Sequence, residues 1–174
     1  MAGSLIKIDE EIVSSPTGSV TLGASDWDNS YNVYMVTFKN VVPSTDATNL
    51  RVRFTVSGTP DSSSNYDRAL KKLNASSSFG NTSSTNQDHL RTSSAGIGTG
   101  TSEVDNGILY LFNFNNASEY SFITVEETLL SNAATHSGNQ GGGVLTVAQA
   151  CDGIQFLMSS DNIASGTISV YGVK

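Results

Sequence analysis

The stretch YNVYMVTFKNVVPSTDATNLRVRFTVS, residues 31–57, decides the fold of this chain. It contains two runs of β-type residues, 31–41 and 49–57, on either side of a polar turn that includes Pro43. In the second run, apolar residues alternate with arginine, threonine and serine, which is the pattern of a strand with one core face and one solvent face. The first run is apolar at both parities, so we expect it to lie centrally in a sheet or against a second layer. The polar turn predicts that the two strands are antiparallel neighbours.

The rest of the chain predicts further strands and no convincing helix, for about nine or ten strands in total. The additional strands are expected at 4–13, 20–24, 108–114, 120–130, 144–147, 154–158 and 167–173, and 66–73 and 87–93 are further candidates. Residues 66–73 could also form an amphipathic helix of one and a half turns, although a strand is preferred. Residues 108–114 are apolar at both parities, which predicts deep burial.

Polar segments separate these strands, and the longest ones, 58–65, 74–85 and 132–143, are expected to be loops. The pattern predicts one domain, residues 1–174, that is all-β. We expect a two-sheet antiparallel sandwich of jelly-roll type. Parity within each strand predicts a core of Val33, Phe38, Leu50, Val52, Phe54, Leu111, Phe112, Phe156, Ile168 and Val170.

The composition argues against some classes of partner. Sixteen acidic and nine basic residues give a net charge of −7, which disfavours nucleic acid because a phosphate backbone would be repelled. The densest basic segment, Arg68 with Lys71 and Lys72, is too short to reverse this. No segment approaches the roughly 20 apolar residues needed to span a membrane. The N-terminus shows no secretory signal pattern, so none is expected.

The sequence contains no recognisable combination of nucleophile, base and oxyanion-hole donor, so we expect no catalytic residue and no cofactor. His89 and His136 lack a second ligand at metal spacing and are predicted to be solvated loop histidines. Cys151 precedes an apolar run and is predicted to be a small buried residue rather than a reactive thiol. Glu126 and Glu127 are adjacent in a strand and therefore face opposite sides, which argues against a glycosidase pair.

Two loops have features of binding sites. Asp26, Asp28 and Asn29 have calcium-like spacing but lack the rest of a calcium loop, so no metal is expected. Trp27 in the same loop is the candidate for surface recognition, for example by stacking on a sugar. The alternative, a Trp that caps one end of the core, is favoured for that residue. Residues 96–100 (GIGTG) lack the lysine and helix of a phosphate loop and predict a flexible hairpin tip.

Three segments together resemble a known group of proteins. The first has Tyr31 and Tyr34 leading into Phe38-x-Asn40-x-x-Pro43, then Asp46 and the alternating strand Leu50-x-Val52-x-Phe54. The others are the central 107–113 (GILYLFN) and a C-terminal pair, 154–156 (IQF) and 166–174 (GTISVYGVK). This combination is similar to small β-rich proteins of tailed bacteriophages, especially marine phages such as cyanophages. These are jelly-roll-like virion structural proteins of tail appendages or head decorations.

The resemblance implies a non-enzymatic structural component of a virion, either a tail fibre, tip or adaptor appendage or a capsid decoration protein. It implies contacts with other virion proteins and homo-oligomers, with a trimer as the first expectation, through loops and an outer strand face. A carbohydrate-binding module that recognises a host surface glycan is the alternative. A glycan-cleaving enzyme is the least favoured hypothesis, because it needs a suitably spaced carboxylate pair.

Overall fold

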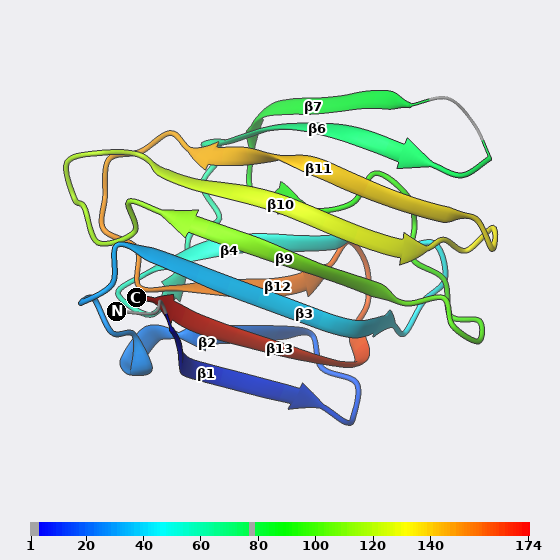
Figure 1. Cartoon of the computed structure of the whole chain (residues 1–174), viewed down its shortest axis with the longest axis horizontal. Coiled ribbons are helices and arrows are strands. Elements are labelled where there is room, and N and C mark those ends of the chain that lie inside the picture. The colour runs from blue at the N-terminus through cyan, green and yellow to red at the C-terminus, as the bar shows by residue number, and fades with distance from the viewer. Residues whose placement is uncertain (1–3, 77–78) are drawn as a thin grey trace.

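The computed structural model describes residues 4–76 and 79–174, which form an all-β sandwich of two antiparallel sheets (Figure 1). The large sheet has eight strands in the order β1-β13-β3-β9-β10-β11-β6-β7, and the small sheet has the order β2-β12-β4-β5, with β8 also paired to β4. The strands are β1 (Leu5–Val13), β2 (Ser19–Gly23), β3 (Val33–Pro43), β4 (Leu50–Val56), β5 (Thr59–Pro60), β6 (Tyr66–Asn74), β7 (Gly80–Gln87), β8 (Leu90–Arg91), β9 (Asp105–Phe112), β10 (Ser121–Leu130), β11 (His136–Leu145), β12 (Gly153–Met158) and β13 (Ile163–Val173). A short 3-10 turn, η1 (Ala24–Asp26), follows β2.

The two strands of the opening stretch lie in different sheets. β3 lies between β13 and β9 in the large sheet, whereas β4 lies beside β12 in the small sheet. The central position of β3 agrees with its two apolar faces, but the prediction that β3 and β4 are antiparallel neighbours is wrong. The polar connection 44–49 passes from one layer to the other, so the core face of β4 packs across the sandwich.

The core lies between the two sheets. The Phe54 ring of β4 packs against Phe114 and Tyr66, with ring centroids 4.6 and 5.6 Å apart. The predicted core residues are at most 1% exposed, except for Val33 and Phe112. Those two side chains are only half-buried, because their parity places them on the outer face of the large sheet. Their assignment to the core is therefore corrected.

β9 is buried on one face only. Leu109 and Leu111 point into the sandwich and are fully buried, whereas Ile108 and Tyr110 on the other parity are exposed to solvent. The prediction of deep burial for residues 108–114 is therefore wrong for the outward parity. The sequence shows that both faces of this strand are apolar, but only one of them is covered by a layer of the described chain.

All three long segments predicted to be loops contain strands, and the one in 58–65 is the two-residue β5. β7 occupies much of the segment 74–85, of which residues 77 and 78 lie outside the described residues. β11 runs through the glycine-rich part of 132–143 and pairs with both β10 and β6. A Cβ atom at Gly142 would lie 2.4 Å from the Ile123 carbonyl oxygen, so the close approach of the chains requires glycine there. A strand of small and polar residues gives no apolar periodicity, so the sequence pattern cannot reveal it. The described residues contain thirteen strands, including the two-residue β5 and β8, where nine or ten were predicted.

The segment 96–100 is bound on both sides and is not a free hairpin tip. The Ile97 N–H donates to the Thr48 carbonyl at 2.7 Å, and the Asn132 N–H donates to the Gly96 carbonyl at 3.1 Å. The Ile97 side chain is fully buried. No helix within residues 4–76 and 79–174 has the length and apolar character to cross a membrane.

The inter-sheet core predicts a large effect for truncation of Phe54. Phe54→Ala should lower the free energy of unfolding by about 3–5 kcal/mol, because it removes the ring from a closely packed, fully buried site. Phe122→Ala is the matched control, since Phe122 lies on the outer face and is 45% exposed. Urea denaturation of both variants provides the measurement. Equal losses for the two variants would contradict this description of the core.

Candidate functional site

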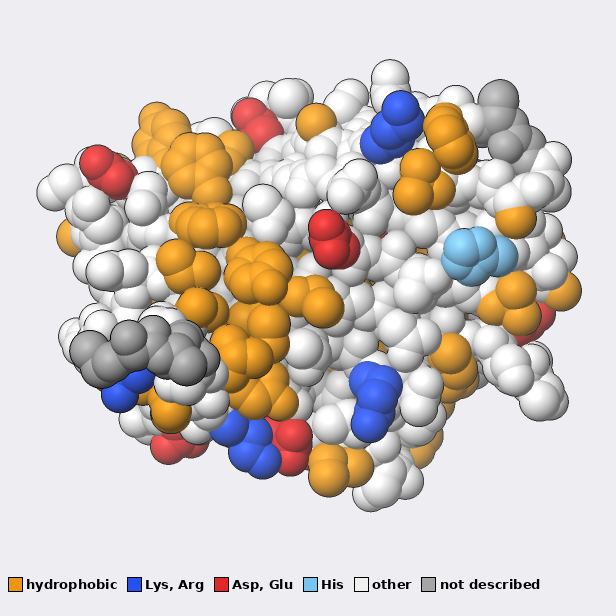
Figure 2. Space-filling view, in the orientation of Figure 1, with side chains coloured by type: hydrophobic (Ala, Val, Ile, Leu, Met, Phe, Trp, Pro, Cys, Tyr) orange, Lys and Arg blue, Asp and Glu red, His pale blue; other side chains and the backbone are white. Residues whose placement is uncertain are grey.

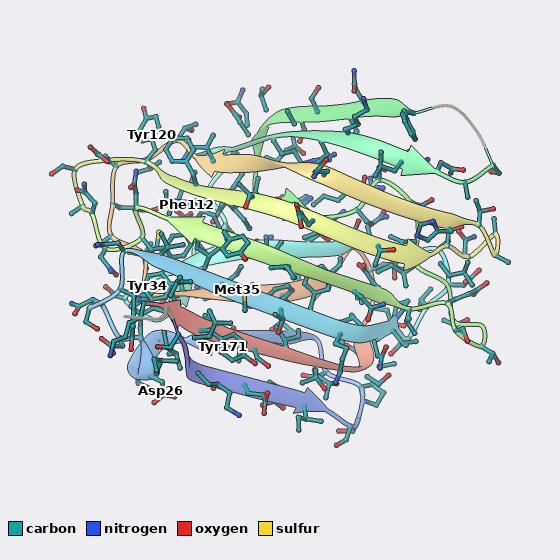
Figure 3. The ribbon with its side chains drawn as sticks, viewed as in Figure 1. Asp26, Tyr34, Met35, Phe112, Tyr120 and Tyr171 are labelled. Carbon is teal, nitrogen blue, oxygen red and sulfur yellow. The ribbon has the colours of Figure 1, made fainter. Side chains whose placement is uncertain are left out.

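The outer face of the large sheet carries a continuous band of apolar side chains, visible in orange in Figure 2. This apolar strip consists of Val33, Met35, Ile108, Tyr110, Phe112, Phe122, Val144 and Tyr171. Strand register aligns Tyr171, Met35 and Tyr110 in one row across β13, β3 and β9. Phe112, Phe122 and Val144 form the next row. Figure 3 shows that Met35, Phe112 and Tyr171 lie along this face, with the exposed Tyr120 at one end of the band.

The size of the apolar strip sets it apart from scattered surface residues. Ile108, Tyr110 and Phe122 are 36%, 37% and 45% exposed. Because an aromatic side chain has roughly 150–250 Å² of surface, Tyr110 and Phe122 together leave on the order of 150 Å² in solvent. The whole strip exposes on the order of 400 Å², comparable with the largest apolar patch of a typical monomer, which is often functional. The strip is therefore the first candidate for a binding surface.

Shallow hollows border the strip on two sides. A hollow of about 440 Å³ lies beside Phe122, where Gly142 contributes backbone but no side chain. Another, of about 410 Å³, lies beside Ile108 and is flanked by Lys39 and Glu126. The strip thus has an uncharged centre and polar margins, which is the composition of a protein contact surface.

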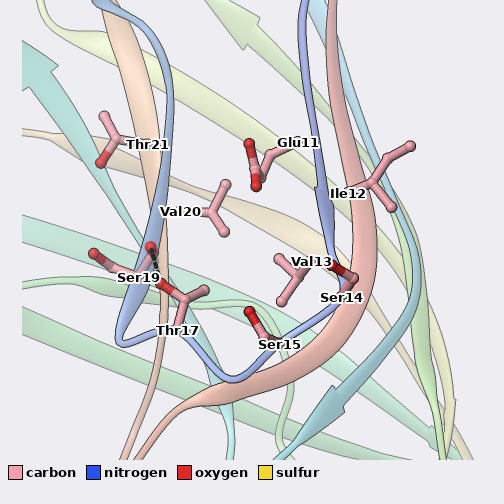
Figure 4. Close-up of a pocket in the computed structure, with 9 residues that line it drawn as sticks. All are labelled: Glu11, Ile12, Val13, Ser14, Ser15, Thr17, Ser19, Val20 and Thr21. Atoms are coloured by element: carbon pink, nitrogen blue, oxygen red, sulfur yellow. Dashed lines mark hydrogen bonds between the residues drawn. The ribbon is translucent and has the colours of Figure 1, made fainter.

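A third hollow lies between the end of β1, the following turn and β2 (Figure 4). Its volume is about 320 Å³, and hydroxyl side chains supply most of its polar lining. The Thr17 hydroxyl is already engaged, since it donates to the Ser19 carbonyl at 3.3 Å. Glu11 provides the carboxylate of the lining, and the lining residues described include no histidine, cysteine or lysine. This hollow can offer hydrogen bonds to a polar ligand but does not combine a base with a nucleophile.

A buried polar network lies inside the sandwich. Asp105 at the start of β9 is 0% exposed, and Glu127 on the inward parity of β10 is 7% exposed. The Asn139 amide of β11 donates to Glu127 Oε2 at 2.5 Å, and the Ser94 hydroxyl donates to Asn139 Oδ1 at 2.7 Å. Within the described residues, no N–H or hydroxyl donor reaches either carboxylate oxygen of Asp105 or Glu127 Oε1. Two facing carboxylates cannot bond to each other unless they share a proton.

Burial determines the protonation of this pair. It raises the pKa of Asp105 well above its ordinary value, and the nearby Glu127 charge raises it further. Burial also raises the pKa of Glu127, to about 7. Carboxyl groups with raised pKa values often occur in active sites, but both of these are enclosed between the sheets. In this structure their network connects three strands of the large sheet to the segment that contains Ser94.

The sequence did not reveal this network, although part of its signal was present. Glu127 occupies the inward parity of the alternating strand 121–130, as its buried neighbours Val125 and Leu129 show. An acidic residue at such a position requires a partner. Asp105 and Asn139 cannot be identified as the partners without the strand order that places β9 and β11 on either side of β10. Glu126 points to the outer face, as the sequence predicts.

Trp27 lies in the loop before β3 and not on the apolar strip. Its ring packs on Tyr34 with centroids 3.9 Å apart, and its Nε1–H donates to Asn115 Oδ1 at 3.0 Å. The side chain is half-buried against the core. The structure therefore does not bring Trp27 together with the exposed aromatic residues of the large sheet. The neighbouring Asp26 and Asp28 are exposed.

The other candidate residues are dispersed. His136 is exposed as predicted, but it lies in strand β11 and not in a loop. His89 is half-buried beside Asp88, with Nδ1 and Oδ1 2.6 Å apart. The prediction of a solvated histidine is therefore wrong for His89. Cys151 is buried, and burial raises the pKa of its thiol to about 11. Among the residues described, no three His, Cys, Asp or Glu side chains group as metal ligands.

Comparison with protein-family models, with curated proteins and with solved structures found no match to this chain. The resemblance to phage virion proteins therefore remains an expectation from strand patterns. The surfaces of the sandwich, above all the apolar strip, are the features from which a function can be inferred.

The buried carboxyl pair predicts a pH-dependent stability. The folded protein keeps the Glu127 proton up to about pH 7, whereas an unfolded chain releases it near 4.5. The free energy of unfolding should therefore fall as pH rises from 5 to 8, by roughly 1.4 kcal/mol per unit of pKa difference. Glu127→Gln should reduce this slope, because an amide can bond to both Asn139 and Asp105 without titrating. Denaturant titrations at several pH values provide the measurement.

Glu126→Gln is the control for this experiment. It removes an adjacent carboxylate from the exposed face of the same strand and should leave the slope unchanged. A slope in Glu127→Gln as steep as that of the unaltered protein, or one that both variants reduce equally, would show that the buried pair does not control stability in this pH range.

Proposed function

We propose that this chain is a non-enzymatic structural component of a tailed bacteriophage virion. It serves as a tail fibre, tip or adaptor appendage, or as a capsid decoration protein, and its sandwich is of the jelly-roll type. The β-sandwich and the strand patterns of the sequence support this proposal. The apolar strip is the observation that carries it, because an assembly protein requires a surface that a neighbour covers.

The strip has the properties of a surface that contacts protein. Its rows cross β13, β3, β9, β10 and β11, so the contact surface is rigid and does not depend on loop conformation. Its centre is uncharged, which suits both a second copy and another virion protein. A trimer remains the first choice for self-assembly, since closed symmetry is the general rule for oligomers.

Carbohydrate recognition is the second candidate, and the exposed aromatic rings favour it. Tyr110, Tyr120 and Phe122 each expose more than a third of their surface at this face. Flat rings on a rigid sheet can stack on the apolar faces of sugars, and polar residues at the margin can bind their hydroxyl groups. In this case the strip would contact a host surface glycan.

The assembly role predicts a specific loss on removal of the strip. The double variant Tyr110→Ser and Phe122→Ser should leave the protein folded but lower its retention on purified phage particles at least about tenfold, because burial of each ring contributes roughly 1.5–3 kcal/mol. Quantitative mass spectrometry of particles banded in a density gradient provides the measurement.

Ile12→Ser is the matched control, since Ile12 is an exposed apolar residue of β1 that does not belong to the strip. It should be retained like the unaltered protein. Absence of the unaltered chain from purified particles would contradict the virion assignment. Saturable binding of a neutral glycan that the double variant loses would favour the carbohydrate-binding function instead.

A further inference from the structure

All four arginines of the chain gather in one region, although they are distant in sequence. Arg51 of β4 and Arg91 of β8 are cross-strand partners, so their side chains lie on the same face. Arg53 follows two residues after Arg51 and has the same parity. Arg68 lies on the inward parity of β6, which contacts β8. We call these four residues the arginine cluster.

The cluster lies where the small sheet ends and the large sheet continues. Figure 1 shows that β6 and β7 extend past the edge of the small sheet. The start of β6 still faces the small sheet, since Tyr66 packs on Phe54 of β4, but β7 has no partner strand in that sheet among the described residues. Arg68 pairs in register with Ser84 of β7, so a hydroxyl group lies beside the cluster. Arg68 and Ser84 also line the hollow beside Phe122 at the margin of the apolar strip.

Most of the cluster lacks a counter-ion among the described residues. Asp88 forms an ion pair with Arg53, at 2.5 Å, and also contacts His89. Within residues 4–76 and 79–174, no carboxylate forms an ion pair with Arg51, Arg68 or Arg91. The chain as a whole has a net charge of −7, but strand pairing brings these arginines together and makes this region locally positive.

Several buried polar atoms of the cluster are also unpartnered. Within the described residues, no acceptor bonds to Arg51 Nε, Arg68 Nη1 or Arg91 Nε, and the Ser84 hydroxyl has no partner. The remaining polar contact of Arg68 is long, with Nη2 at 3.4 Å from Thr82 Oγ1. Buried donors usually have acceptors, so the gathering of these groups at one place needs an explanation.

The neighbouring groups do not provide the missing charge. Burial lowers the pKa of Arg68 and Arg91, and repulsion from other arginines lowers each of them further. Glu127 attracts Arg91, but the two form no ion pair in the described structure, and burial raises the pKa of Glu127 to about 7, which reduces its charge near neutral pH. Like charges directly opposite each other on paired strands are destabilising. A bound anion would remove this repulsion and supply the missing acceptors.

We propose that the arginine cluster, with Ser84, binds a compact tetrahedral oxyanion, a phosphate or sulfate group. Such a group has several acceptor oxygens arranged around one centre, so it can accept hydrogen bonds from guanidinium groups that come from different strands. Arg51, Arg68 and Arg91 provide the N–H donors, and the Ser84 hydroxyl provides one more. The anion is either free in solution or a substituent of a larger ligand. This site is separate from the proposed assembly function and does not depend on it.

The test uses the intact chain with inorganic phosphate and inorganic sulfate. In the ¹⁵N-labelled protein, the Nε–H signals of Arg51, Arg68 and Arg91 should shift and saturate as the anion is added. Ionic strength is held constant with sodium chloride, so general screening cannot produce the change. Thermal unfolding in the same buffers should show a higher melting temperature with phosphate or sulfate than with chloride.

Variants separate a specific site from net charge. Arg91→Gln and Arg68→Gln should each weaken binding at least about tenfold. Lys39→Gln removes the same charge from the outer face and should change the affinity little. Without phosphate, Arg91→Gln should melt at or above the temperature of the unaltered protein, since it relieves repulsion. With saturating phosphate the order should reverse, an outcome that a merely misfolded variant would not give.

A monosaccharide phosphate distinguishes the two sources of the anion. Tighter binding than that of inorganic phosphate places the group on a larger ligand, whereas equal affinity indicates the free anion. Shifts that do not saturate, or that chloride reproduces, would overturn the proposal. Equal losses in Arg91→Gln and Lys39→Gln would also overturn it.

Discussion

The packing of the two inner sheet faces holds this protein together. The backbone ladders of the described residues end at the borders of the two sheets, so contacts across the sandwich must align the sheets. Phe54 is central to these contacts, since its ring meets both Phe114 and Tyr66. The Tyr66 hydroxyl also accepts a bond from the Phe54 N–H at 3.0 Å, which links β6 to β4. Apolar packing and directed bonds therefore fix the relative position of the layers, since the Gly23 N–H of β2 also donates to Asp9 Oδ2 of β1 at 3.0 Å.

Close packing between the sheets also determines where charged side chains can be buried. Asp105 and Glu127 are enclosed, but burial raises the pKa of both groups, which favours their neutral forms, and the Asn139 amide donates to Glu127. At the edge where the small sheet ends, Arg51, Arg68 and Arg91 have no such compensation from the described residues of this chain. The buried carboxyl pair therefore lowers its own charge through raised pKa values, whereas we propose that a bound anion neutralises the arginine cluster.

The sequence predicts the all-β sandwich correctly, because the alternating residues 50–56 and the apolar runs in 33–43 and 105–112 do form strands in the structure. It does not predict which strands are neighbours, since parity carries no information about pairing. For this reason the sequence placed β3 and β4 side by side and did not show the arginine cluster. The strands β7 and β11 escaped prediction for another reason: their side chains are small and polar, and their pairing depends on backbone contacts. The apolar strip was present in the sequence as the second apolar face of β3 and β9, but parity alone assigned it to the core.

If the chain works as proposed, another protein covers the outer face of the large sheet in an assembled particle. Electron cryo-microscopy of that particle tests this most directly, because the density shows what lies against each face of the sandwich. We predict that the apolar strip, including Tyr110 and Phe122, lies in contact with a neighbouring protein subunit. A reconstruction in which this face points into open solvent would contradict the proposal.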